Sequence, residues 1–137
     1  MKRGAVAGAH RHGAPARALA GVAFMLFAGM AQAEVIDLHW QDGGSFERSL
    51  AIAPGKFVEL CGPLEAGQAI RWSFKADRAL NFNIHYHVDQ DVRYPAKKDQ
   101  VASLQGDLAV DTQQDYCWMW VNKAKTAAKL SVSLIRN

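Results

Sequence analysis

Apolar and polar residues alternate in a series of short segments that span most of the chain after residue 33. The clearest segment is NFNIHYHV (81–88), which has asparagine and histidine at odd positions and apolar or aromatic residues at even positions. A period of two is typical of a β-strand with one face against a core. The same pattern recurs at 36–40, 46–52, 56–61, 70–74, 116–120 and 130–134.

Turn-forming sequences separate these segments and predict where the strands end. They are QDGG (41–44), APG (53–55), CGPLEAG (61–67), KADR (75–78), YPAKKD (94–99) and QGD (105–107). Segment 122–129 contains helix-forming residues but no apolar face, so we interpret it as a loop. The sequence therefore predicts an all-β fold, an antiparallel β-sandwich or jelly roll, with a single domain over residues 34–137.

The first 33 residues have the pattern of a secretory signal peptide. A basic leader precedes the apolar run ALAGVAFMLFAGM (18–30), and AQA (31–33) supplies small residues for cleavage. The run is shorter than the roughly 20 residues of a bilayer-spanning helix. We therefore expect cleavage after Ala33, a periplasmic or secreted protein, and no stable membrane insertion afterwards. An amino-terminal membrane anchor is the alternative.

Removal of this leader changes the charge of the protein. The whole chain has 16 Lys and Arg residues against 13 Asp and Glu residues, a net charge of +3. Without the four basic residues of the leader, 12 basic residues (16 less 4) face 13 acidic ones. Nucleic-acid binding, which needs a concentrated basic face, is not expected. The lysines in or beside two predicted loops would form an anion-binding rim only if the loops meet: Lys97, Lys98, Lys123, Lys125 and Lys129.

The two cysteines, Cys61 and Cys117, are predicted to form a disulfide because the chain is exported to an oxidising compartment. A pair of redox or metal-binding thiolates is the alternative, but the Cys-x-x-Cys spacing that would favour it is absent. If Leu60 and Trp118 face the core, both cysteines lie on the opposite face of their strands. The disulfide is therefore expected outside the main core, on the outer surface or at a sheet end.

The order of segments in residues 56–137 resembles the GOLD domain of the p24/emp24 cargo-receptor family. That family has a strand of the form Gly-x-Tyr-x-Phe-Cys-Phe-x-Asn before its last strand. In DYCWMWVN, the tyrosine, the two aromatic positions and the asparagine are matched by Tyr116, Trp118, Trp120 and Asn122. The family glycine is absent, and Met119 stands at the cysteine position. The resemblance implies an extracellular β-sandwich that acts as a binding or adaptor module.

His85 and His87 are candidate ligands of a metal ion, because residues i and i+2 of a strand point to the same side about 7 Å apart. Met119, His39 and Glu59 are candidates for a third ligand. A set of two histidines and one methionine in an exported protein would suit copper. The alternative is a polar surface on which the histidines are solvated. Asn81 and Asn83 would then extend it as part of a partner-binding surface.

Catalytic signatures are absent from the sequence. It contains no Gly-x-Ser-x-Gly elbow, no His-Glu-x-x-His and no phosphate-binding glycine loop, and its carboxylates are spread singly. We therefore predict an exported binding or accessory module without catalytic activity. Its partner would be a protein or a small molecule, and copper is the one cofactor considered. A periplasmic copper-binding protein is the first alternative, and a small hydrolase or hydrolase accessory subunit is the second.

Overall fold

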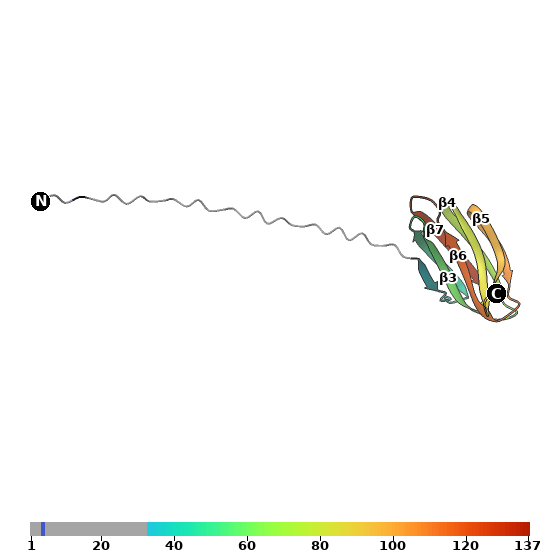
Figure 1. Cartoon of the computed structure of the whole chain (residues 1–137). Coiled ribbons are helices and arrows are strands. Elements are labelled where there is room, and N and C mark those ends of the chain that lie inside the picture. Colours follow the sequence, from blue (N-terminus) through green and yellow to red (C-terminus); the bar gives the residue numbers. More distant parts are fainter. Residues whose placement is uncertain (1–3, 5–32) are drawn as a thin grey trace.

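Seven β-strands build the part of the chain that the computed structural model describes, which is Gly4 and residues 33–137. The strands, shown in Figure 1, are β1 (Glu34–Asp37), β2 (Ser45–Ile52), β3 (Phe57–Leu64), β4 (Ala69–Val88), β5 (Asp91–Ala109), β6 (Gln114–Val121) and β7 (Ala128–Arg136). The predicted signal peptide lies almost entirely outside the described residues. Within the described part of the chain, no helix has the length and apolar character needed to cross a membrane.

The strands form a sheet that curls into two layers because β4 belongs to both of them. The strand order is β1-β3-β6-β4-β7-β2, and β5 pairs with β4. Residues 70–76 of β4 pair with β7, whereas residues 81–85 pair with β6. The β4–β5 register shifts between Lys75 and Leu80, where β4 changes partner. Strands that pass from one layer to the other in this way form the corner of a sandwich.

The predicted β-sandwich is confirmed, and its strand pairings are antiparallel with one exception. The short strand β1 pairs with β3 in parallel, from Glu34 opposite Val58 to Asp37 opposite Cys61. The loop predicted over 122–129 is shorter in the structure: residues 122–127 form a loop, and β7 begins at Ala128.

Three predicted turns are wrong, because segments 75–78, 94–99 and 105–107 lie inside β4 and β5. These strands form one hairpin of 20 and 19 residues, which turns at residues 89–90. A fourth predicted turn starts late, since β3 continues to Leu64. Most of β5 is exposed and lies at a sheet edge, so its sequence lacks a regular apolar face and accommodates Pro95.

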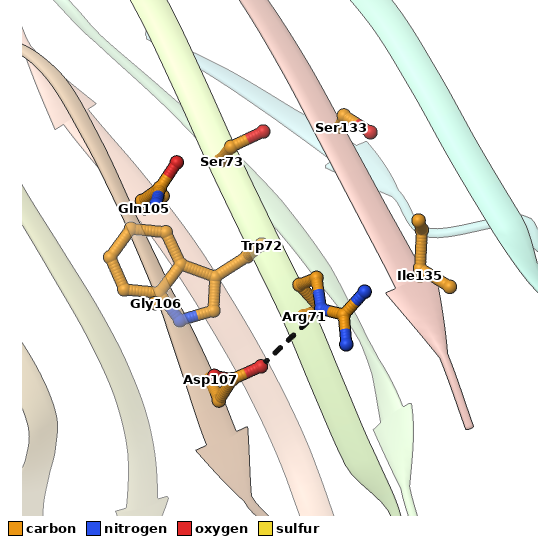
Figure 2. A pocket seen from close by; sticks show the side chains of 8 residues that line it. All are labelled: Arg71, Trp72, Ser73, Gln105, Gly106, Asp107, Ser133 and Ile135. Atoms are coloured by element: carbon orange, nitrogen blue, oxygen red, sulfur yellow. Dashed lines mark ion pairs between the residues drawn. The ribbon is translucent and has the colours of Figure 1, made fainter.

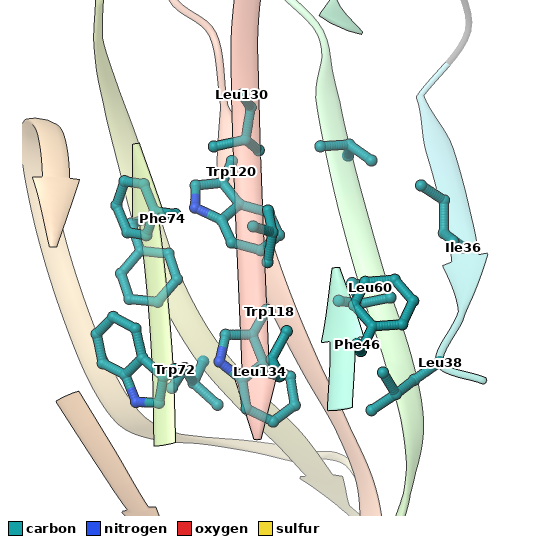
Figure 3. Packing of buried hydrophobic residues seen from close by; sticks show 14 of the residues in the cluster. Ile36, Leu38, Phe46, Leu60, Trp72, Phe74, Trp118, Trp120, Leu130 and Leu134 are labelled. Atoms are coloured by element: carbon teal, nitrogen blue, oxygen red, sulfur yellow. The ribbon is translucent and has the colours of Figure 1, made fainter. Parts of the chain in front are cut away.

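The even-numbered apolar residues of the strands meet between the two layers, as their alternation predicted. Trp118 and Trp120 are fully buried. The ring of Phe82 lies 4.9 Å from that of Trp72, 4.8 Å from that of Phe74 and 5.6 Å from that of Trp120, measured between centroids. Figure 3 shows how residues of β4 and β6 meet those of β2, β3 and β7 in this core. Burial of this apolar surface is the main force that holds the layers together.

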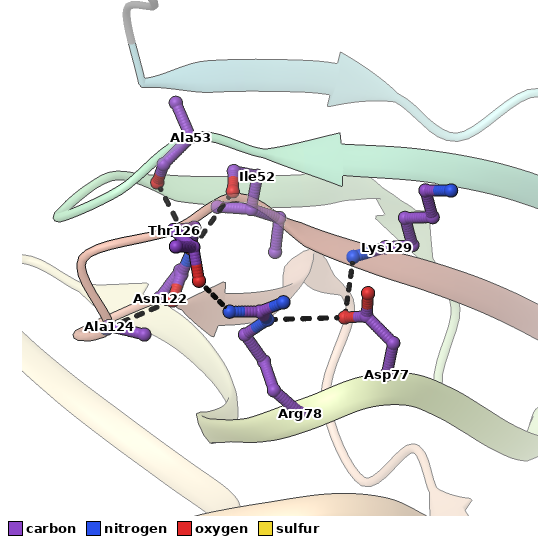
Figure 4. Close-up of polar contacts among 8 residues, drawn as sticks. All are labelled: Ile52, Ala53, Asp77, Arg78, Asn122, Ala124, Thr126 and Lys129. Atoms are coloured by element: carbon purple, nitrogen blue, oxygen red, sulfur yellow. Dashed lines mark hydrogen bonds and ion pairs between the residues drawn. The ribbon is translucent and has the colours of Figure 1, made fainter.

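A polar network closes one end of the sandwich, as Figure 4 shows. The amide of Asn122 donates hydrogen bonds to the carbonyls of Ile52 at 3.0 Å and Thr126 at 2.8 Å. Asp77 accepts the backbone N–H of Lys129 at 2.9 Å. Arg78 donates to the Thr126 hydroxyl. The network ties the bend of β4 to the loop before β7 and to the end of β2.

Candidate functional site

The outer face of β3, β6 and β4 brings together most of the site residues that the sequence predicted. Residues paired across neighbouring strands point to the same side of a sheet. The strand register puts Glu59, Met119 and Asn83 in one row. Cys61, Cys117 and His85 form the next row. We call this group the histidine face, and it comprises Glu59, Cys61, Asn83, His85, Cys117 and Met119.

Cys61 and Cys117 form the disulfide that the sequence predicted. They are directly opposed in the β3–β6 pairing, with their Cα atoms 4.1 Å apart. Their neighbours Leu60 and Trp118 are fully buried on the core side. The disulfide therefore lies on the outer face of the sheet, as the alternation of both strands indicated.

His85 is buried on this outer face and is not solvated, since only 7% of its surface is exposed. Its Nδ1 lies 2.8 Å from Oδ1 of Asn83. An amide oxygen only accepts hydrogen bonds, so Nδ1 is the donor and the neutral ring has its lone pair on Nε2. Burial lowers the pKa of His85; the nearby Glu59 carboxylate opposes this effect and His87 adds to it. The fold therefore favours the neutral imidazole.

Glu59 extends across β6 toward His85 and lies beside the disulfide. Its Oε1 lies 4.0 Å from Nε2 of His85, and its Oε2 lies 3.9 Å from Sγ of Cys61. Glu59, His85 and Cys117 each offer one ligand-type atom, and these three atoms lie within 4.8 Å of one another. Glu59 was one of three candidates for a third metal ligand, and the structure places it against the histidine.

The other candidate residues lie around this centre. Sδ of Met119 is 3.7 Å from the amide nitrogen of Asn83. His87 is exposed, and its ring centroid is 5.4 Å from that of His85. His39 lines a shallow groove that Cys61 and Cys117 also line. Asn81 accepts hydrogen bonds from the backbone and side chain of Gln100, so its oxygen serves to hold β4 and β5 together.

Sequence reasoning missed Tyr94, because segment 94–99 was interpreted as a turn. Tyr94 is 52% exposed, and its ring centroid lies 6.0 Å from that of His85. The ammonium group of Lys97 is 5.4 Å from the centre of the Tyr94 ring. The alternation of β4 gave no signal for this neighbour, because its position depends on the β4–β5 hairpin.

The opposite outer face carries a shallow hollow of about 290 Å³, shown in Figure 2. It is lined by Arg71, Trp72, Ser73, Gln105, Gly106, Asp107, Ser133 and Ile135. Arg71 and Asp107 form an ion pair across it at 3.7 Å, and both side chains are mostly exposed. Active sites usually combine a deeper pocket with titratable groups of shifted pKa. This hollow gives no support to a hydrolase.

Most charged side chains of residues 34–137 lie at one of the two ends of the sandwich. At the end where β3 begins and β6 ends, the basic residues are Lys56, Lys75, Arg78, Lys97, Lys98, Lys123, Lys125 and Lys129, accompanied by Glu34, Asp77 and Asp99. At the other end the acidic residues are Asp42, Glu65, Asp89, Asp91, Asp107, Asp111 and Asp115, accompanied by Arg71, Arg93 and Arg136. We call these the basic end and the acidic end. The lysines of the two predicted loops thus lie at the same end.

Comparison with known proteins shows that this fold is similar to those of several solved structures. No protein-family model matches the chain, and no curated protein sequence matches it. The chain is similar in structure to PliG of Aeromonas hydrophila, a periplasmic lysozyme inhibitor of g-type lysozyme. The TM-score is 0.63 at 12% identity, over 77% of this chain and 98% of that chain.

Two further structures described as periplasmic inhibitors of g-type lysozyme show the same likeness. PliG of Salmonella Typhimurium matches with a TM-score of 0.56 at 11% identity, over 77% of this chain and 100% of that chain. A mutant of the Escherichia coli protein matches with a TM-score of 0.52 at 10% identity, over 77% of this chain and 99% of that chain. None of the three is described as a GOLD domain, so that resemblance stays a prediction. At these identities the likeness is one of fold, and it extends over nearly the whole length of each inhibitor.

Proposed function

We propose that residues 34–137 form an exported, non-catalytic module that binds a protein partner. The observation that carries this proposal is the match in fold to nearly the whole length of three periplasmic inhibitor proteins. The signal-peptide pattern of residues 1–33 supports export. The binding function of those three proteins makes g-type lysozyme the first partner to test.

The acidic end is the surface that we assign to the partner. Its carboxylates lie on loops and strand ends, where sandwich folds commonly carry binding residues. Glu65 and Asp111 are exposed on neighbouring loops, which are joined by the hydrogen bond from the Gly67 N–H to the Val110 carbonyl at 2.8 Å. Clustered charge of one sign attracts a partner of the opposite sign and raises its association rate. The partner surface is therefore expected to be cationic.

The test measures binding of the mature, disulfide-intact domain to a g-type lysozyme by calorimetry, together with the rate of peptidoglycan hydrolysis. We expect a one-to-one complex that slows hydrolysis and weakens as salt is added. The variant Glu65→Lys/Asp111→Lys should bind at least tenfold more weakly. The matched variant Lys123→Glu/Lys125→Glu changes the charge at the basic end by the same magnitude with the opposite sign, and it should bind no more weakly than wild type.

Each result bears on a separate part of this proposal. Lack of binding to g-type lysozyme would reject that partner. Equal losses in the two variants would reject the acidic end as the contact surface. Hydrolysis of peptidoglycan by the domain alone would reject the non-catalytic assignment and favour the hydrolase alternative.

Copper binding by the disulfide-intact protein is a second candidate function, supported by the meeting of Glu59 and His85. The proposed ligands are His85, His87 and Met119, with Glu59 as the additional group. A copper titration should show one tight site in wild type and none in His85→Ala/His87→Ala. Weak and equal binding in both proteins would reject this function.

A further inference from the structure

We propose that opening the Cys61–Cys117 disulfide creates a closed site for a divalent metal ion of the zinc class. Its four ligands would be the two cysteine thiolates, Nε2 of His85 and the carboxylate of Glu59. The proposal rests on the geometry of the histidine face and does not depend on the protein-binding function above. It makes affinity for metal ions of this class a property of the reduced protein.

The ligand atoms already surround one point. One atom each from Glu59, His85 and Cys117 lies within 4.8 Å of the others, and the second sulfur is bonded to the first. In a tetrahedral zinc site the metal lies about 2.0–2.3 Å from nitrogen, oxygen and sulfur ligands, which puts neighbouring ligand atoms roughly 3–4 Å apart. Small rotations of side chains on one sheet face close this difference.

The imidazole of His85 is already oriented as metal-binding histidines are. Such histidines usually donate their other ring N–H to an oxygen, which fixes the ring and its tautomer. Here Oδ1 of Asn83 accepts that hydrogen bond at 2.8 Å, so the lone pair of Nε2 faces Oε1 of Glu59. Two acceptors that face each other without a proton repel. A cation between them would remove the repulsion.

The strand pairing preserves the frame of the site when the disulfide opens. Eight consecutive residue pairs join β3 to β6, from Phe57 opposite Val121 to Leu64 opposite Gln114. Cys61 and Cys117 are therefore held opposite each other by the sheet as well as by their own bond. Both thiols would stay on the outer face, beside His85 and beneath Glu59.

The chemistry balances with a dithiol as the reductant. The dithiol gives two electrons and two protons to Cys61–Cys117 and closes to its own cyclic disulfide. The metal ion then displaces one proton from each cysteine thiol, while His85 and Glu59 bind with a lone pair each. Zinc has no redox chemistry of its own, so the thiolates stay reduced. In the oxidised protein the two sulfurs are bonded to each other and cannot bind the metal as thiolates. Only His85 and Glu59 then remain from this ligand set.

The test uses Co²⁺ as a spectroscopic probe of the mature domain. The protein is reduced with dithiothreitol and freed from it without oxygen, and the oxidised protein is titrated in parallel. Reduced wild type should bind one Co²⁺, with thiolate-to-cobalt charge-transfer absorption and visible bands of a tetrahedral site, and Zn²⁺ should displace it. Oxidised wild type should show none of these bands.

Two ligand variants and one matched control variant test whether His85 and Glu59 bind the metal ion together with the two thiolates. His85→Ala and Glu59→Gln should each weaken Co²⁺ binding to the reduced protein at least tenfold. Glu47→Gln, which makes the same change to an exposed carboxylate on β2, should leave it unchanged. Bands of equal intensity and affinity in all variants would overturn the proposal, because the thiolates alone would then explain the binding. A lack of bands in reduced wild type would also overturn it.

Circular dichroism covers the case in which the reduced, metal-free domain unfolds. Zinc should then restore the β-sheet spectrum of wild type but not that of His85→Ala. Failure to restore the wild-type spectrum would overturn the proposal. Because lysozyme binding is measured on the oxidised protein, either proposal can fail without affecting the other.

Discussion

The side-chain amide of Asn122 donates a hydrogen bond to the carbonyl of Ile52, which lies 70 positions earlier in the chain. Asn122 is fully buried, and its oxygen also accepts the N–H of Ala124 at 3.0 Å. A single side chain thus satisfies backbone groups of the β2 end and of the loop before β7. Asn122 directly follows β6, and it is the asparagine that matched the GOLD pattern in the sequence.

Replacing this residue, Asn122→Ala, should lower the free energy of unfolding by about 3 kcal/mol, because several buried backbone groups lose their partners. Urea unfolding followed by tryptophan fluorescence measures this change. Asn81→Ala serves as the control. The Asn81 side chain is hydrogen-bonded to the exposed Gln100, so this substitution should lower the free energy of unfolding by less than about 1 kcal/mol. Equal losses in the two variants would contradict the role assigned to Asn122.

The variant Cys61→Ala/Cys117→Ala, which lacks the disulfide, should have a free energy of unfolding about 4 kcal/mol lower than that of the disulfide-intact wild type. This is the value expected for a disulfide that closes a loop of this length. The two cysteines are 56 positions apart. Because the β3–β6 pairing extends on both sides of the disulfide, we expect the variant to keep its β-sheet spectrum at low temperature. Thermal and urea unfolding measure the loss. An unchanged midpoint would show that the disulfide makes no net contribution to the free energy of unfolding.

Gly106 lies opposite Trp72 in the β4–β5 hairpin, and the indole ring occupies the space beside it. A Cβ atom at position 106 would come within 2.6 Å of Cζ2 of Trp72. Gly106→Ala should therefore displace the ring and cost about 1–3 kcal/mol. Near-ultraviolet circular dichroism and the melting temperature report both effects. Ser103→Ala, on the exposed part of the same strand, should change neither, and identical behaviour of the two variants would refute the contact.

Tyr116 should make the domain sensitive to alkaline pH. Burial raises the pKa of Tyr116, and Tyr86 and Asp111 add to the effect. In its protonated form the hydroxyl donates a hydrogen bond to the Thr112 carbonyl at 3.0 Å. The unfolded phenol titrates near 10. The stability gained from the raised pKa is complete below about pH 10 and is lost as the pH rises through the folded pKa.

Unfolding free energies measured between about pH 8 and pH 11 test this expectation. Wild type should lose stability across the upper part of this range more steeply than Tyr116→Phe, which has no phenol to ionise at that position. Parallel curves for the two proteins would show that another group controls alkaline unfolding.

The core was predictable from the sequence because most strands have one buried and one exposed face. The tryptophans of β6 and the rings of β4 follow this rule. It failed along β5, where Pro95, Lys97 and Lys98 read as a turn although the residues form an edge strand. It also failed at 75–78, where β4 passes between layers and its exposed polar residues mimic a loop.

The candidate site was predictable only in part, for a related reason. Alternation placed His85 and both cysteines on outer faces, and export predicted their disulfide. The approach of Glu59 to His85 follows from the strand order β3-β6-β4. Local periodicity carries no information on which strands become neighbours. The burial of His85 likewise depends on side chains from several strands.

The passage of β4 through both layers means that the domain has no half that can melt alone. If the 20-residue strand comes loose, β6 and β7 each lose a partner, and β5 loses its only one among the described strands. Proteolytic cleavage of β4 near its bend would disrupt the strand pairing of both layers at once. The molecule should therefore resist partial fraying and, once opened, come apart in a single cooperative step.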